Sequence, residues 1–489
     1  MQFPFDNTYV QLPESLFSRV RPTPVKAPRL IAFNRGLAET LGIAVPDDEA
    51  DLAEIFSGNR LPQGAEPLAM AYSGHQFGQF VPLLGDGRAI LVGEVRDAAG
   101  QRYDIQLKGA GLTPYSRRGD GRSALGPVMR EYLVSEAMAA LQIPTTRALA
   151  AVATGETVVR ERFLPGAVMT RVALSHIRVG TFQYVATSGD VAALKRLADY
   201  AIERLYPQLA GSEARYERFL EAVIARQASL VARWMHIGFV HGVMNTDNSS
   251  ISGETIDFGP CAFLDAYHPG TVFSSIDEMG RYAFGNQPRI MLWNLTRLAE
   301  ALIPLLAETQ EAAIAKAEAS LATFKPAFEA AFEAGVRAKL GFATPEPDDM
   351  ALATEFYRLM AAGTVDFTLA FRRLADAALG ELADASVRQL FAAAEGFDLW
   401  AMRWRERLAH ESGGSEAAQA LMRSVNPAVI PRNHRIEAVI KAAIKAGDFD
   451  PFHRLAAALA DPYSVRPEFQ WAEQPPKPDE RVLQTFCGT

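Results

Sequence analysis

The chain has 489 residues, of which 49% are apolar and 22% are charged, so the composition is that of a folded protein and excludes extensive disorder. This length exceeds what one hydrophobic core usually supports, and we expect more than one substructure. The net charge of −8 gives no overall attraction to nucleic acid or to an anionic membrane, so neither is expected as a partner.

The sequence carries no targeting or membrane signal that we recognise. The first ten residues lack an apolar signal core, and no run of about 18 apolar residues occurs elsewhere. We therefore expect a cytoplasmic protein. Only two cysteines are present, Cys261 and Cys487, which argues against a disulfide framework and against a thiolate zinc site.

The first part of the chain is predicted to be an extended arm followed by a strand-rich block. Residues 1–66 mix proline and charged residues around one short helical pattern, which is typical of an arm packed on a larger body. In the block that follows, residues 67–187, apolar residues between Pro127 and Leu141 recur at helical spacing. Short β-like runs predict strands at 89–95, 103–108, 156–162 and 167–173.

Beyond residue 188 the pattern becomes helical. Helices are predicted at 191–209 and 216–237, and a short hairpin around Ser252-Gly253 is predicted at 250–258. We assign residues 188–300 to a helical lobe and residues 301–489 to a helical C-terminal extension with a cysteine-containing tail. The fold class expected is α+β, with a small β-rich lobe before a helical lobe, which is the order of a two-lobed protein kinase.

The segment from His241 to Asn248, followed by Asp257-Phe258-Gly259, carries the strongest chemical signal. In kinases a His-Arg-Asp loop is followed by an Asn that binds metal and by Asp-Phe-Gly. Here Asn248 and Asp257 supply oxygen ligands suited to Mg²⁺ or Mn²⁺ bound to phosphates. Val243 stands where the catalytic base belongs, and a carboxylate occurs instead at Asp247, within reach of the metal site as a general base.

Several segments before this loop suit phosphate binding. The turn Gly85-Asp86-Gly87-Arg88 precedes a strand, and its glycines would let backbone N–H groups approach a phosphate. Lys108 ends a strand, as the phosphate-binding lysine of kinases does, with Glu131 and Glu136 on the following helix as candidate partners. The remaining candidates for an anion site are Asp120 and Gly121, in an arginine-rich turn, and Arg171 and Arg178.

The residues alone leave three interpretations open. The chain is a nucleotide enzyme with altered chemistry, an inactive pseudokinase that binds nucleotide and presents its helical region to a partner, or a small-molecule phosphotransferase. Val243 favours the pseudokinase and counts against the phosphotransferase, because antibiotic kinases keep an Asp at that position. The presence of Lys108, Asn248 and Asp257 argues against an inert scaffold, which has little need of metal ligands.

The chain contains long and uncommon motifs in four stretches, Tyr72–Phe80 through Glu94, Gln106–Gly109 through Arg122, Gly238–Leu264 and Pro431–His434. In these motifs, and over nearly its whole length, the chain resembles the selenoprotein O family, also called YdiU proteins. What the resemblance implies is a kinase-like fold that binds ATP in a reversed orientation and transfers AMP to Ser, Thr or Tyr hydroxyls of proteins, with pyrophosphate leaving.

The resemblance also implies roles for individual residues. It assigns the acid/base role to Asp247 and the metal ligands to Asn248 and Asp257, and its spacing favours Glu131 as the partner of Lys108. Because animal members of the family carry selenocysteine close to the C-terminus, where this chain has Cys487, a disulfide between Cys261 and Cys487 becomes a hypothesis. The nucleotide contacts that it implies are Gly85, Gly87, Arg88, Lys108, Asp120, Gly121, Arg171, Arg178 and Asp257.

Overall fold

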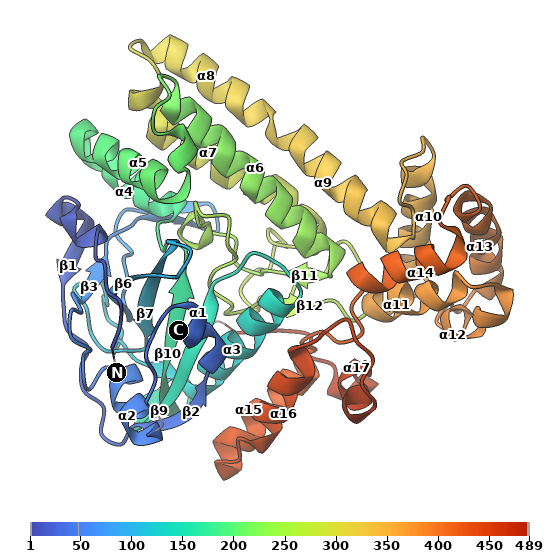
Figure 1. Ribbon diagram of the computed structural model, residues 1–489, viewed down its shortest axis with the longest axis horizontal. Coiled ribbons are helices and arrows are strands. Elements are labelled where there is room, and N and C mark those ends of the chain that lie inside the picture. The colour runs from blue at the N-terminus through green and yellow to red at the C-terminus, as the bar shows by residue number, and fades with distance from the viewer. Residues whose placement is uncertain (1, 47, 487–489) are drawn as a thin grey trace.

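The structure is a computed structural model that describes residues 2–46 and 48–486, and it is a mixed α and β fold (Figure 1). Its β-rich part is built on an eight-stranded sheet in the order β1-β3-β6-β7-β10-β9-β2, with β8 paired to β10. The strands are β1 (Phe17–Arg19), β2 (Arg29–Phe33), β3 (Leu68–Met70), β6 (Ala89–Arg96), β7 (Arg102–Lys108), β8 (Ser123–Ala124), β9 (Arg147–Val159) and β10 (Phe163–Ala173).

The sequence pattern located the central strands well and misplaced one boundary. The strands predicted at 89–95 and 103–108 are confirmed as β6 and β7, but β9 begins at Arg147 rather than at residue 156. Its first half is a run of small residues that includes the fully buried Ala148 and Ala151. This half is covered by helix α3 (Leu125–Ala140), so it has no alternating exposed face for the pattern to detect.

The arm of residues 1–66 adds strands to both edges of the sheet. β1 pairs with β3 at one edge and β2 pairs with β9 at the other. Two short helices follow β2, α1 (Arg35–Thr40) and α2 (Glu49–Phe56), and both begin with a side-chain cap, from Asn34 and Asp48 respectively. The arm is therefore an integral part of the sheet.

A separate hairpin lies outside the main sheet. Its strands are β4 (Gly74–Gln76) and β5 (Gln79–Val81), joined by Phe77 and Gly78, which both adopt positive φ. Sequence patterning did not predict this hairpin, because each strand has only three residues.

Helices make up most of the rest of the chain. Long helices pack against one another beside the sheet in Figure 1, and the predicted boundary between residues 300 and 301 lies within α7. They are α4 (Val179–Ser188), α5 (Val191–Leu205), α6 (Arg215–His236), α7 (Gln287–Leu306), α8 (Gln310–Ala322) and α9 (Phe324–Lys339). In the described part of the chain, no helix is both long enough and apolar enough to cross a membrane.

The last helices form a second packed group and then return to the β-rich part. Phe356, Trp400 and Trp404 stack in the core of that group. Further on, Phe452 packs against Tyr132 of α3, with ring centroids 5.6 Å apart. The helices are α10 (Asp349–Ala362), α11 (Phe367–Ala377), α12 (Ala385–Arg388), α13 (Ala394–Leu408), α14 (Gly414–Val425), α15 (Asn433–Ala446), α16 (Asp450–Leu459) and α17 (Gln470–Glu473).

The prediction of a hairpin at residues 250–258 is wrong. Ser250 instead bridges to Arg178, and Thr255 bridges to Thr145, so the two ends of this segment pair with distant parts of the chain rather than with each other. A two-stranded ladder of β11 (Phe239–Val240) and β12 (Ala262–Phe263) encloses the whole segment. Between these strands lies a short 3-10 turn, Thr246–Asn248.

Candidate functional site

A cavity of about 600 Å³ with many charged residues in its wall lies where the Gly85–Arg88 turn, the end of β7 and the 246–257 segment meet. Its wall contains most of the residues singled out in the sequence, whereas Glu131 and Asn248 are not among its lining residues in the described chain. The predicted residues in the wall are Gly85, Gly87, Arg88, Lys108, Asp120, Gly121, Arg171, Arg178, Asp247 and Asp257.

At one side of the cavity, two cations and two carboxylates form a cluster. Lys108 Nζ lies 2.7 Å from Glu131 Oε2 and 2.5 Å from Asp257 Oδ1. Arg171 Nε donates to Glu131 Oε1 at 2.9 Å, and its guanidinium lies 3.4 Å from Asp257. Glu136, the other candidate partner of Lys108, binds Arg147 instead.

The electrostatics of this cluster favour the charged forms. Burial alone would raise the pKa values of Glu131 and Asp257, but Lys108 and Arg171 outweigh it and hold both below their usual range. The Asp257 side chain is about a third exposed, 32%, whereas that of Glu131 is 5% exposed. Asp257 is therefore an ionised carboxylate that borders the cavity.

The loop between β11 and Asp257 is held by a buried histidine. His241 bonds the Ile256 carbonyl through Nε2 at 2.9 Å, and its Nδ1 accepts from the Val243 N–H at 3.3 Å. Burial lowers the pKa of His241 and so favours the neutral imidazole. His241 thus fixes the start of the loop to its end, next to Asp257.

Asp247 lies at the cavity wall with one carboxylate oxygen unpartnered. Gln76 Nε2 donates to its Oδ2 at 3.3 Å, while Oδ1 is buried and has no hydrogen-bond partner in the described chain. Burial raises the pKa of Asp247 to about 6. A carboxylate of this kind is suited to accept a proton.

The oxygen donors of Asn248 and Asp257 are of the kind that a hard divalent cation prefers. Asn248 donates through Nδ2 to the Val243 carbonyl at 3.0 Å, which leaves Oδ1 as the acceptor of the amide. Asn248 and Asp257 thus offer one amide oxygen and one carboxylate. No group of three or more His, Cys, Asp or Glu side chains suited to a metal occurs in the described residues, so other oxygen ligands would have to complete the coordination of a Mg²⁺ or Mn²⁺ ion.

The cavity wall also contains residues that were not selected as site candidates from the sequence, among them Tyr72, Gln76, Asp86 and Arg160. The buried Asp86 accepts from Gln106 Nε2 at 3.1 Å and lies 3.4 Å from the Arg178 guanidinium, which stacks 4.3 Å above the Tyr72 ring. Arg160 binds Asp120 at 2.8 Å. Tyr72 and Gln76 belong to the Tyr72–Phe80 motif, and the match of this motif to the family is the sequence signal that could have identified them.

The structure gives the predicted glycines a packing role. A Cβ on Gly85 would lie 2.3 Å from the Tyr115 ring, and one on Gly87 would lie 2.9 Å from the Tyr115 carbonyl oxygen. Gly121, at φ +70°, abuts Gly111. These contacts fold the two cavity turns tightly against each other.

Cys261 is buried and donates its thiol to the Phe258 carbonyl at 3.4 Å. Burial raises its pKa to about 12, which keeps the thiol protonated. Its predicted partner Cys487 lies outside the described residues, so the disulfide stays a prediction. Thr485, near the end of the described chain, nevertheless lies close to Cys261. Its N–H donates to the Phe273 carbonyl at 2.7 Å, and its hydroxyl donates to the carbonyl of Pro260, the residue before Cys261.

Comparison with known proteins assigns the chain to a family. The profile described as Protein adenylyltransferase SelO matches residues 1–460. A relative from Bradyrhizobium sp. (strain BTAi1) is 62% identical over 490 residues, and one from Rhodopseudomonas palustris (strain BisB5) is 61% identical over 491 residues. Both alignments cover 100% of each chain, and both relatives are named Protein nucleotidyltransferase YdiU. The chain therefore belongs to the SelO family of protein adenylyltransferases, which are nucleotidyltransferase enzymes.

Proposed function

We propose that this protein transfers AMP from ATP to Ser, Thr or Tyr hydroxyls of other proteins and releases pyrophosphate. The observation that carries the proposal is the unpartnered Oδ1 of Asp247 at the wall of a cation-rich cavity. A proton acceptor beside a polyphosphate site is what hydroxyl attack on phosphorus requires. Membership of the SelO family supports the same reaction.

In the proposed reaction, the acceptor hydroxyl oxygen bonds to the α-phosphorus as the bond to the bridging oxygen of pyrophosphate breaks. Asp247 takes the hydroxyl proton. Lys108, Arg171 and Arg178 neutralise the triphosphate, and Glu131 fixes Lys108 and Arg171. Asn248 and Asp257 would hold Mg²⁺ or Mn²⁺, which when bound offsets the negative charge that develops on the phosphates.

We also propose a kinase-like architecture with ATP bound in the reversed orientation. Support for the architecture comes from a sheet lysine paired with a glutamate of the following helix, and from Asn248 and Asp257 on the segment enclosed by β11 and β12. Support for the reversed pose comes from the Arg88-bearing turn and the arginine-rich turn around Asp120. They line the same cavity as Arg171 and Arg178, and a concentration of guanidinium groups suits phosphates rather than adenine.

The test is incubation of the purified protein and a mixture of candidate acceptor proteins with ATP labelled at either the α- or the γ-phosphate. We expect protein-bound label from α-labelled ATP alone, and mass spectrometry should find added AMP on hydroxyl side chains. Transfer of the γ label alone would overturn the proposal in favour of a phosphotransferase. Nucleotide binding without transfer of either label would favour the inactive pseudokinase.

A further inference from the structure

An aromatic and cationic surface runs from the β4–β5 hairpin to α7. Phe80, which is 39% exposed, packs against His75 across the hairpin, with ring centroids 4.9 Å apart and the rings tilted by 46°. His75 in turn meets the Trp293 ring edge-on at 5.1 Å. Two guanidinium groups flank Trp293, Arg281 at 4.8 Å and Arg297 at 4.9 Å from the ring centroid. We call these five residues the Trp293 surface.

The hairpin side of this surface is fixed to the loop that carries the candidate base. His75 N donates to Thr246 Oγ1 at 2.7 Å, and Phe77 N donates to Asn245 Oδ1 at 3.1 Å. The neighbouring strand residue Gln76 contacts Asp247 itself. The Trp293 surface therefore includes His75, the immediate neighbour in sequence of Gln76, whose side chain contacts Asp247.

The Arg281 side of the surface is fixed to the same loop. The Tyr282 hydroxyl donates to Asn245 Oδ1 at 2.6 Å. The Arg281 guanidinium also packs against the hairpin turn, because its carbon lies 3.5 Å from the position that a Cβ on Gly78 would take. The two sides thus converge next to Asn245, two positions before Asp247.

Arg281 carries a positive charge that the described chain does not match. No ion pair joins it to a carboxylate there, and its Nε is buried without a hydrogen-bond partner. Asp277, four positions before Arg281, uses its carboxylate to accept from the backbone N–H groups of Arg281 and Tyr282, at 2.9 and 2.7 Å. Arg297, in contrast, pairs with Glu300 at 2.7 Å.

We propose that the Trp293 surface docks the acceptor segment of the protein substrate and that Arg281 selects segments with a carboxylate side chain close to the modified hydroxyl. An arginine stacked on an aromatic ring loses little further freedom when it pairs with a carboxylate, which suits it to this role. Because the protein as a whole carries a net charge of −8, attraction of an acidic segment must come from a local site such as this one. The inference rests on the proposed transfer to protein hydroxyls.

The first test measures binding and is independent of chemistry. The probes are two fluorescent peptides that carry one Tyr and differ only in whether Glu or Gln flanks it. By fluorescence anisotropy, we expect the wild-type protein to bind the Glu peptide roughly fivefold more tightly, the size of one partly exposed ion pair. Arg281→Glu should remove this preference, whereas Arg358→Glu, the same charge change at an exposed site on α10, should keep it.

Transfer from α-labelled ATP to the same peptides is the second readout. Equal binding of both peptides by the wild-type protein, or an unchanged preference in Arg281→Glu, would overturn the docking site even if AMP transfer occurs. A Glu preference that depends on Arg281, without any transfer of the α label, would support the docking site and contradict the proposed reaction. ATP affinity should be the same in all three proteins, which also verifies that the variants are folded.

Discussion

Asp247 is the residue at which the proposed reaction can be tested most directly. A buried carboxylate oxygen without a partner costs free energy, so its presence at the cavity wall points to a use other than stability. Asp247→Asn keeps the size of the side chain but removes the proton acceptor. We expect AMP transfer to fall by at least about 100-fold, because general base catalysis is worth that much or more. Isothermal titration should find ATP affinity close to that of the wild-type protein.

Asp461→Asn is the matched control, since Asp461 is exposed and far along the chain from the cavity residues. It should transfer AMP at the wild-type rate. If Asp247→Asn also does so, the base lies elsewhere and the assignment of Asp247 fails.

At the scale of elements, the β4–β5 hairpin is a close-fitting cover for the 246–248 turn. An ideal Cβ on Gly74 would lie 2.4 Å from Asp247 Oδ1 and 2.8 Å from Leu84 Cδ1, so a side chain there forces the hairpin and the turn apart. We expect Gly74→Ala to lower the rate of AMP transfer by roughly 100-fold, the usual consequence of displacing a reacting group by about 1 Å. Initial rates at saturating ATP would measure this effect.

Gly211→Ala provides the comparison for Gly74→Ala. A Cβ on Gly211 would meet no other atom within 4 Å, and the φ of Gly211 is not in the left-handed region. A wild-type rate is expected for it. Equal rates for both variants would mean that the hairpin does not position Asp247.

An element can be predicted from the sequence when the residues that determine it lie close together in the chain. β6 and β7 carry their own β-like pattern, and Lys108 and Asp257 stand in recognisable motifs, so each could be found in advance. The β4–β5 hairpin could not be predicted, because it packs against a turn that lies far along the chain. The hydrogen bond between His75 N and Thr246 Oγ1 joins residues 171 positions apart. The same holds for Arg281, whose position beside Trp293 and Gly78 depends on the packing of the distant β4–β5 hairpin against this part of the chain.

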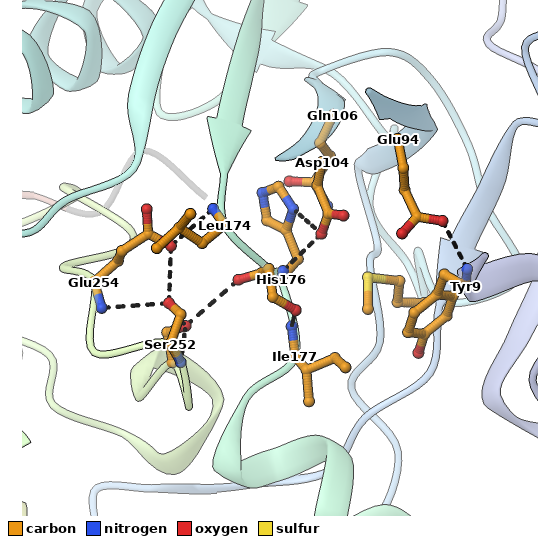
Figure 2. Close-up of polar contacts among 12 residues, drawn as sticks. Tyr9, Glu94, Asp104, Gln106, Leu174, His176, Ile177, Ser252 and Glu254 are labelled. Atoms are coloured by element: carbon orange, nitrogen blue, oxygen red, sulfur yellow. Dashed lines mark hydrogen bonds and ion pairs between the residues drawn. The ribbon is translucent and has the colours of Figure 1, made fainter. Parts of the chain in front are cut away.

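Across the whole molecule, buried polar groups join the N-terminal arm, the sheet and the segment before Asp257 (Figure 2). Tyr9 N donates to Glu94 Oε2 at 2.6 Å, and His176 Nδ1 lies 3.0 Å from Asp104 Oδ2. Glu254 accepts from Leu174 N at 2.9 Å and from the Ser252 hydroxyl at 2.8 Å. Within this network, Glu254 is the carboxylate whose pKa burial raises towards neutral pH, so it contributes a pH dependence to stability.

Burial raises the pKa of Glu254 from 4.5 to about 7. Between these values the folded protein retains a proton that the unfolded chain releases, so the free energy of unfolding falls as pH rises and levels off above about pH 7. The full shift corresponds to a loss on the order of 3 kcal/mol. Glu254→Gln should abolish this loss. The melting temperature of the variant minus that of the wild-type protein should therefore be larger at pH 8 than at pH 5.

Glu308→Gln, at an exposed position, should leave the melting temperature unchanged relative to the wild-type protein at both pH values. If Glu254→Gln behaves in the same way, Glu254 is ionised in the folded protein across this range and contributes nothing to the pH dependence.

The return of the C-terminal helices to α3 has a consequence for biosynthesis. Arg130 on α3 contacts Asn433, which lies 303 positions later, and Phe452 of α16 covers Tyr132. At a typical rate of translation, the ribosome needs about 15 to 60 seconds to make that intervening stretch. During this time the face of α3 that α15 and α16 later cover lacks its native partner, and such exposed apolar surface is prone to non-native association.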